Sequence, residues 1–101
     1  MKTFIARLYK TELDKLTDII LSKKMTNAQL VEFCFNNFIK LNKKKQTEYS
    51  RYLEFDRLKT YPFQVKFNEE FVDKFDYTAE ILNVKRGQLL RMILMSVIEP
   101  K

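Results

Sequence analysis

The sequence has no histidine, no tryptophan, one glycine, two prolines and one cysteine. The absence of histidine removes a main zinc ligand and the most common general base, and it leaves Cys34 without a Cys–His nucleophile pair. One glycine cannot form a glycine-rich phosphate loop, and so few turn residues disfavour a sheet with many tight turns. We therefore expect a mainly helical protein that is not an enzyme, needs no metal or cofactor and takes no small-molecule substrate.

Cys34 lies in an apolar run, residues 31–35, which predicts a buried thiol rather than a reactive one. A lone cysteine forms no disulfide framework and fits a reducing compartment. The sequence shows no apolar stretch long enough for a signal peptide or a membrane span. These features predict a cytoplasmic protein without a membrane partner.

Hydrophobic content and charge predict one folded domain, residues 1–101, with a polyanionic partner. Of the 101 residues, 46% are hydrophobic and 14% are aromatic, which is enough for a core. The net charge of +6 favours a polyanion, and the positive excess lies in residues 1–61. The single lysine run, residues 43–45, is either a solvated turn or a phosphate contact.

The two halves of the sequence repeat one apolar pattern. A shift of 59 residues, which places Phe4 on Phe63, aligns them without a gap. The paired apolar positions are Phe4/Phe63, Ala6/Val65, Leu8/Phe67, Leu13/Val72, Leu16/Phe75, Ile20/Ala79, Met25/Val84, Leu30/Leu89, Cys34/Ile93, Phe38/Val97 and Ile39/Ile98. This alignment predicts a first repeat at residues 2–41, a connector at 42–61 and a second repeat at 62–99.

Each repeat begins with a short strand. Residues 3–8 and 62–67 alternate between apolar and polar side chains, and Pro62 is tolerated at the first position of a strand. A first helix then follows each strand. Residues 11–14 have the form of a capping box, which predicts a helix over about 12–23, and the counterpart begins after Asn68.

A second helix ends each repeat. Residues 26–29 form another capping box and open an apolar segment that continues through Leu41. The counterpart opens at 85–88 and runs over 89–99, although Lys85 cannot cap a helix as threonine does. These helices are apolar on nearly every side, so other elements must cover them. The two repeats are therefore expected to interlock.

The connector must return the chain from the end of one repeat to the strand of the next. Tyr49, Tyr52 and Leu53 have helical spacing and predict a short extra helix within residues 48–55. Its tyrosine and basic side chains suit either packing or DNA contact, and packing is the favoured interpretation.

The order of elements and two local motifs resemble the ribbon-helix-helix family, which includes the Arc and MetJ repressors. Residues 63–71 look like the family's strand and acidic helix start, and 83–91 are similar to its turn and second helix. Residues 24–32 are a weaker match that keeps the capping Thr26. The resemblance implies a mainly α fold with a two-stranded antiparallel β-ribbon. Both units lie in one chain, a tandem pseudo-dimer similar to the conjugation protein TraY.

In this family the ribbon enters the major groove of double-stranded DNA, so the resemblance implies base contacts from its outward side chains. The six outward positions are Thr3, Ile5, Arg7, Pro62, Gln64 and Lys66, and we expect base contacts from all except Pro62. Arg7 and Lys66 can donate to guanine, and Gln64 can pair with adenine. Ile5 and Thr3 can contact a thymine methyl group.

Phosphate contacts are expected at the starts of the second helices, where free backbone N–H groups attract anions. The expected phosphate-contacting residues are Thr26, Asn27, Ala28, Lys85, Arg86 and Gly87. Arg86 and Gly87 suit close approach to an anion. Additional DNA contacts are expected from Lys2, Lys43, Lys44 and Lys45.

These residues predict a sequence-specific DNA-binding protein, foremost a transcriptional repressor or regulator of a plasmid or phage type. Because the two strands carry different outward side chains, the target need not be palindromic, and further copies are expected on adjacent sites. The alternatives are an accessory protein of a conjugation relaxosome or of plasmid segregation, and an antitoxin-like interaction module. The antitoxin role usually needs a long tail, whereas only Pro100 and Lys101 follow the last expected helix.

Overall fold

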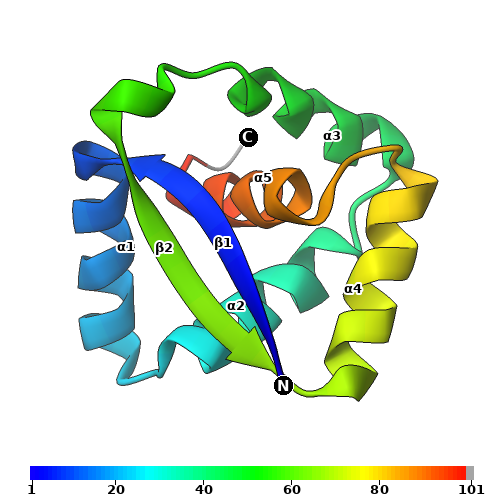
Figure 1. Ribbon diagram of the computed structural model, residues 1–101, viewed down its shortest axis with the longest axis horizontal. Coiled ribbons are helices and arrows are strands. Elements are labelled where there is room, and N and C mark those ends of the chain that lie inside the picture. The colour runs from blue at the N-terminus through cyan, green and yellow to red at the C-terminus, as the bar shows by residue number, and fades with distance from the viewer. Residues whose placement is uncertain (100–101) are drawn as a thin grey trace.

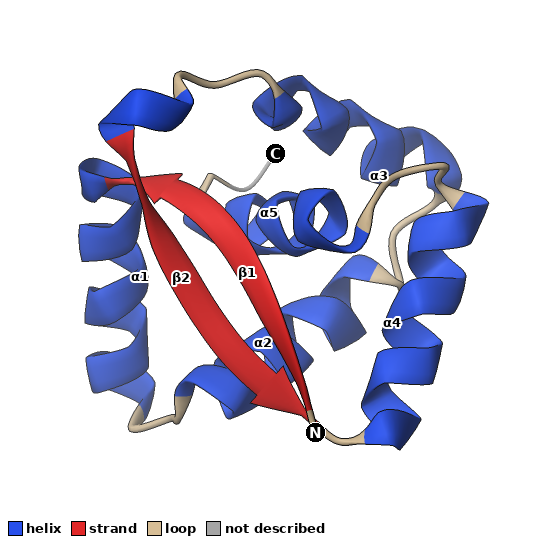
Figure 2. Ribbon diagram, in the orientation of Figure 1, coloured by secondary structure: helices blue, strands red, loops and turns tan. Residues whose placement is uncertain are grey.

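The computed structural model describes residues 1–99, which form a mainly helical fold with one two-stranded antiparallel sheet (Figures 1 and 2). The elements, in chain order, are β1 (Lys2–Tyr9), α1 (Lys10–Lys23), α2 (Asn27–Phe38), α3 (Lys43–Glu48), the 3-10 turns η1 (Tyr49–Leu53) and η2 (Arg57–Lys59), β2 (Thr60–Phe67), α4 (Glu69–Ile81) and α5 (Arg86–Ile98). The expected fold class is therefore confirmed at this level. None of the helices in the described range is both long and apolar enough to cross a membrane.

The two strands pair side by side into a ribbon, with Ile5 opposite Gln64. The inward side chains are all buried: Phe4, Ala6, Leu8, Phe63, Val65 and Phe67. The predicted alternation is confirmed, but both strands are longer than expected. β1 covers Lys2–Tyr9 rather than residues 3–8, and β2 begins at Thr60 rather than at residue 62. Pro62 is thus the third residue of β2, a position open to proline because each strand of a two-stranded sheet is an edge.

The start of α1 corrects one prediction from the sequence. The helix begins at Lys10, and Tyr9 takes the N-cap position that was expected near Thr11. The reason is Glu12, whose Oε1 accepts the Tyr9 N–H at 2.8 Å. This is the acidic half of a capping box, and it fixes the helix start two residues earlier than expected.

The other helix starts follow the predicted caps. Thr26 caps α2, because its Oγ1 accepts the Gln29 N–H at 3.1 Å while Gln29 accepts the Thr26 N–H at 2.9 Å. Asn68 caps α4 through a 3.0 Å bond from the Phe71 N–H. Lys85 provides no side-chain cap, as expected, but its N–H donates to Gln88 Oε1 at 2.8 Å.

The connector folds earlier in the chain than the tyrosine spacing predicts. Asn42 caps α3 by accepting the Lys45 N–H at 2.9 Å, so residues 43–45 form the first turn of a helix. The predicted 48–55 segment contains mainly η1. The preceding helix α2 also ends at Phe38 instead of continuing to Leu41, because the Leu41 N–H bonds back to Phe38 in a tight turn.

The core is centred on α5, which crosses the middle of the molecule behind the ribbon (Figure 1). Residues 89–95 of this helix are all buried. It packs against β1, α2 and η1, which belong to the earlier part of the chain, in accord with the predicted interlocking. Cys34 is also buried, and burial raises the pKa of its thiol to about 12.

Candidate nucleic-acid interface

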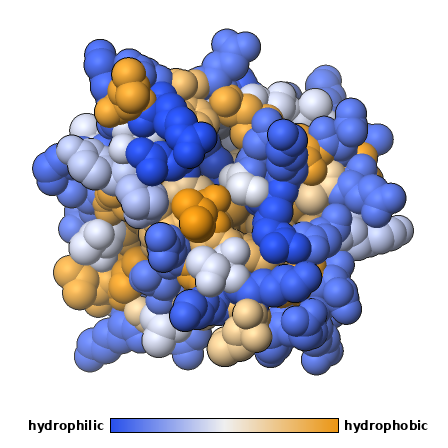
Figure 3. Space-filling view, in the orientation of Figure 1, coloured by the Kyte–Doolittle hydropathy of each residue, from blue (hydrophilic) through white to orange (hydrophobic). Residues whose placement is uncertain are grey.

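Four of the five side chains predicted to contact bases are exposed on the outward face of the ribbon. Thr3 lies opposite Lys66, and Ile5 lies opposite Gln64. All four are exposed, including the apolar Ile5, of which 47% is accessible. Figure 3 looks onto the face that carries the ribbon, where hydrophobic spots lie among mainly hydrophilic side chains. The face therefore offers hydrogen-bonding groups around an apolar centre.

Arg7, the fifth predicted base contact, is held by the protein itself. Its Nη2 donates to the Thr60 carbonyl at 2.7 Å, and its Nε donates to Thr60 Oγ1 at 3.1 Å. A longer bond of 3.5 Å reaches the Arg57 carbonyl. A bidentate contact with guanine would require these bonds to break. The sequence shows the position of Arg7 on the outward face, but not the connector residues beside it.

The N-terminus of α2 lies at one side of the ribbon. Thr26, Asn27 and Ala28 line a hollow of about 390 Å³ together with Thr3, Gln64, Val65 and Lys66. The structure thus brings one group of predicted phosphate contacts next to three predicted base contacts. The N–H groups of Asn27 and Ala28 lie in the first turn, where a helix provides no acceptor of its own. This end of α2 can donate to an anion.

The N-terminus of α5 lies at the other side. Lys85 and Gly87 line a hollow of about 250 Å³ with Ile5 and Arg7, and Leu53 and Phe55 of the connector cover part of it. A Cβ atom on Gly87 would lie 2.9 Å from the Ile5 carbonyl oxygen. Glycine is therefore required here by the close contact between α5 and β1. This packing explains Gly87 without the close approach to an anion that its sequence context suggested.

Arg86 also has an internal partner. Its guanidinium donates to both carboxylate oxygens of Asp76, at 2.9 and 2.6 Å, and lies over the Phe4 ring at 4.7 Å from the centroid. This hydrogen-bonded pair lowers the pKa of Asp76 and raises that of Arg86. The side chain of Arg86 is thus engaged in the fold, and only its backbone N–H, at the first position of α5, remains a candidate for phosphate.

The lysines predicted as additional contacts are in different places. Lys2 is exposed at the first position of β1. Lys43 and Lys44 line a shallow hollow on α3, and α3 packs against η1. Neither of the hollows beside the ribbon includes residues 43–45. The structure therefore separates the lysine run from the candidate interface.

Arg91 is a residue whose role the sequence did not reveal. It is buried in α5, and its guanidinium donates to Glu12 at 2.8 and 3.1 Å, to the Arg7 carbonyl at 2.9 Å and to the Tyr52 carbonyl. The Phe55 ring lies against it, 4.6 Å from the centroid. Arg91 therefore joins the ribbon, α1 and the connector. An arginine within the otherwise apolar segment 89–95 was the available signal.

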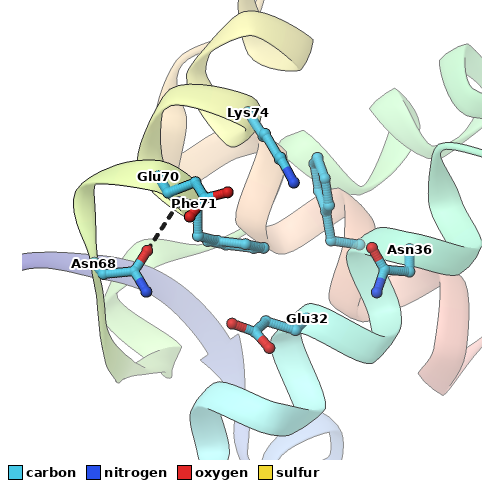
Figure 4. Close-up of a pocket in the computed structure, with 7 residues that line it drawn as sticks. Glu32, Asn36, Asn68, Glu70, Phe71 and Lys74 are labelled. Atoms are coloured by element: carbon cyan, nitrogen blue, oxygen red, sulfur yellow. Dashed lines mark hydrogen bonds between the residues drawn. The ribbon is translucent and has the colours of Figure 1, made fainter.

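A separate hollow of about 220 Å³ lies between α2 and α4 (Figure 4). Its lining consists of Glu32, Phe35, Asn36, Asn68, Glu70, Phe71 and Lys74. None of these belongs to the predicted DNA-contacting set. Groups of three or more His, Cys, Asp or Glu residues that could hold a metal ion do not occur in residues 1–99.

The candidate interface therefore consists of the outward ribbon face and two flanking helix N-termini. Equivalent positions in the 59-residue alignment lie on opposite sides of it: Thr26 and Lys85, Ala28 and Gly87, and Lys66 and Arg7. Comparisons with known protein families, with curated proteins and with solved structures found no match to this chain.

Proposed function

We propose that the protein binds double-stranded DNA by placing the β1–β2 ribbon in the major groove. In this proposal β1–α1–α2 and β2–α4–α5 act as two ribbon-helix-helix units in one chain, a tandem pseudo-dimer. The observation that carries the proposal is the exposed ribbon face flanked on both sides by the N-termini of α2 and α5. Base-reading side chains and phosphate-binding backbone groups would then approach one duplex together.

The dimensions and chemistry of the ribbon fit this partner. The major groove of B-form DNA is about 12 Å wide and admits a two-stranded ribbon. The Gln64 amide can pair with adenine, Lys66 can donate to guanine, and Ile5 can contact a thymine methyl group. Each good bidentate contact discriminates between bases by roughly 1–3 kcal/mol.

The flanking helices would fix the ribbon in the groove. Free N–H groups at a helix N-terminus bind phosphate oxygens, and such contacts position a protein on the duplex without reading sequence. The net charge of +6 adds attraction to the polyanion. Phosphate binding therefore rests on the N-termini of both helices and not on the side chain of Arg86.

The centre of the ribbon makes the proposed site asymmetric. Ile5 lies opposite Gln64, so the two strands present different groups to the two halves of a target. One chain would therefore bind a short element that is not palindromic. Transcriptional regulation is the role that we propose for such sequence-specific binding.

The proposal is tested by selecting bound duplexes from a random library and measuring affinity over a range of salt concentrations. Gln64→Ala should relax the preference at one base pair, whereas Asn36→Ala, which removes an exposed amide on α2, should leave it unchanged. Lys66→Ala should weaken binding more than Lys74→Ala, its charge-matched control on α4. Failure of the unmodified protein to prefer any duplex would overturn the proposal.

A further inference from the structure

The connector places an unusual turn at one end of the ribbon. This turn, η2, comes just before β2 and carries Leu58, of which 96% is exposed, between the exposed Arg57 and Lys59 (upper left in Figure 1). No carboxylate within residues 1–99 pairs with the Arg57 or Lys59 side chain. The turn thus presents one apolar and two cationic side chains to solvent.

Hydrogen bonds hold the turn in place although its own side chains bury nothing. The Asp56 N–H donates to the Tyr9 hydroxyl at 2.8 Å, which ties the turn to the end of β1. Asp56 Oδ1 accepts the Leu58 N–H at 3.1 Å. Thr60 Oγ1 donates to the Arg57 carbonyl at 2.7 Å. The turn is therefore a fixed part of the ribbon end.

Arg7 connects this turn to the outward face of the ribbon. Its side chain leaves β1 on that face, and its guanidinium donates to Thr60 and more weakly to the Arg57 carbonyl. These bonds reach Arg57 and Thr60, on either side of Leu58, so they fasten the turn to a side chain that leaves β1 on the same face as Ile5. The guanidinium of Arg7 is thus engaged in holding the turn that carries the cationic Arg57 and Lys59.

We propose that η2 is a third DNA-contacting element, which lengthens the ribbon at one end. Arg57 and Lys59 contact phosphates, Leu58 contacts base edges, and Arg7 is the positioning residue that holds the turn. The inference rests on the proposed DNA binding and extends it. It names this turn as the source of additional affinity and of additional sequence reading on one side of the target.

The length of the strand sets where the extra contacts should fall. Thr60, the residue that follows η2, is four residues before the central Gln64. Because a strand rises about 3.3 Å per residue, the end of η2 nearest the ribbon lies at least roughly 13 Å along the strand from its centre. Phosphates along one DNA strand are spaced about 3.4 Å along the helix axis. Because a ribbon in the major groove runs obliquely to that axis, the turn should meet the duplex at the outer base pairs of the site, on one side alone.

The main experiment compares Arg57→Ala/Lys59→Ala with Lys40→Ala/Lys74→Ala on the selected duplex. The control pair also removes two exposed lysine or arginine charges, and Lys40 follows the C-terminal end of α2, away from the ribbon. Loss of two phosphate contacts should lower the slope of log K against log salt by about 1.8. Affinity at 0.1 M salt should fall on the order of 10- to 100-fold, and hydroxyl-radical protection should shrink on one side.

Sequence reading by the turn is tested with Leu58→Ala and the control Leu21→Ala, which truncates a leucine that is 70% exposed on α1. Library selection with Leu58→Ala should lose preference at the outer base pairs on one side and keep the central preference. Leu21→Ala should keep both. Unchanged outer preference in Leu58→Ala would overturn the base contact of Leu58.

A mutant cycle tests whether Arg7 acts by positioning the turn or by contacting DNA itself. If Arg7 acts by positioning the turn, Arg7→Ala added to Arg57→Ala/Lys59→Ala should weaken binding by no more than about twofold further. A full additive loss would overturn the positioning role and assign Arg7 to an independent contact. If Arg57→Ala/Lys59→Ala has the same affinity, salt slope and footprint as its control, η2 does not contact the DNA and the inference is overturned. The ribbon proposal would then still stand if Gln64→Ala relaxed the central preference.

Discussion

The two sides of the ribbon have the same backbone arrangement but are stabilised by different chemistry. On the α5 side, buried Arg91 is paired with Glu12 and covered by the connector residue Phe55. The residues 59 positions away are Glu32 and Phe71, which line the open hollow of Figure 4. One side therefore relies on a buried ion pair, whereas the other has no such pair at the equivalent positions.

Aromatic packing replaces the ion pair on the α2 side. Phe71 packs against Phe67, Phe35 and Phe75 with centroid distances of 4.2, 5.3 and 5.9 Å. Such rings add stabilisation beyond the area that they bury. The comparison shows that two segments with the same order of strand, helix and helix are joined to the ribbon by different side-chain chemistry. The connector supplies Tyr52 and Phe55 to the contacts of Arg91 on the α5 side, and at the end of α2 its Gln46 donates to the Phe38 carbonyl at 3.0 Å.

The largest expected effect comes from Arg91→Ala. It would leave Glu12 partly buried without its partner and would remove donors from the Arg7 and Tyr52 carbonyls. Removing one partner of a buried ion pair costs about 3–5 kcal/mol of unfolding free energy. Urea unfolding of Arg91→Ala should show a loss of this size. Glu32→Ala, at the equivalent exposed position, should change stability by less than about 0.5 kcal/mol.

The double variant Arg91→Met/Glu12→Met sharpens that prediction. If the loss in Arg91→Ala comes from an unpaired buried charge, replacing both charges by apolar side chains should recover a large part of it. A double variant as unstable as Arg91→Ala would show that this side is held by the bonds to the backbone carbonyls and by the cap that Glu12 provides for Tyr9, and not by the ion pair.

Gly87→Ala should have the next largest effect. A Cβ there would lie 2.9 Å from the Ile5 carbonyl oxygen, so α5 must move away from β1. Overpacking of this kind costs typically about 1–3 kcal/mol. Ala28 occupies the equivalent position in α2. Ala28→Gly should cost at most roughly 1 kcal/mol, the usual helix penalty of glycine, and equal losses in the two variants would contradict the asymmetry.

Local signals in the sequence predicted much of the fold. The alternation in both strands and the caps Thr26 and Asn68 depend on residues within three or four positions, so they could be read directly. The start of α1 was missed because Glu12, not Asp14, completes the cap. The side-chain positions of Arg7 and Arg86 could not be predicted, since their partners Thr60 and Asp76 are brought close only by folding. An arginine at an outward position of a strand gives no sign of whether other residues of the folded protein already accept hydrogen bonds from its guanidinium.

The two helix caps provide a smaller test. Thr26→Ala removes the side-chain acceptor of the Gln29 N–H and should destabilise the protein by about 1 kcal/mol. Lys85 lacks that acceptor, so Lys85→Thr should stabilise α5 by a comparable or smaller amount. Thermal unfolding of both variants measures the difference. A stabilising Thr26→Ala or a destabilising Lys85→Thr would show that contacts outside the caps control these helix starts.

The smallest expected effect concerns the Asp76–Arg86 pair, which exists on the α5 side alone because Thr17 and Asn27 occupy the equivalent positions. Asp76 is partly exposed, so the pair should contribute roughly 0.2–1 kcal/mol. Arg86 lowers the pKa of Asp76 in the folded protein below its ordinary value of 3.8. The folded state therefore binds this proton less readily than the unfolded chain does. The stabilisation is fully present well above pH 3.8 and is lost as the pH falls through 3.8 toward the lower pKa of the folded state. The difference in unfolding free energy between the unmodified protein and Asp76→Asn should accordingly shrink on acidification in urea titrations. If this difference instead stays constant from pH 7 to below pH 3, the amide introduced by Asp76→Asn replaces the carboxylate as a neutral acceptor for Arg86. The negative charge of Asp76 then contributes nothing to the stability of the α5 side.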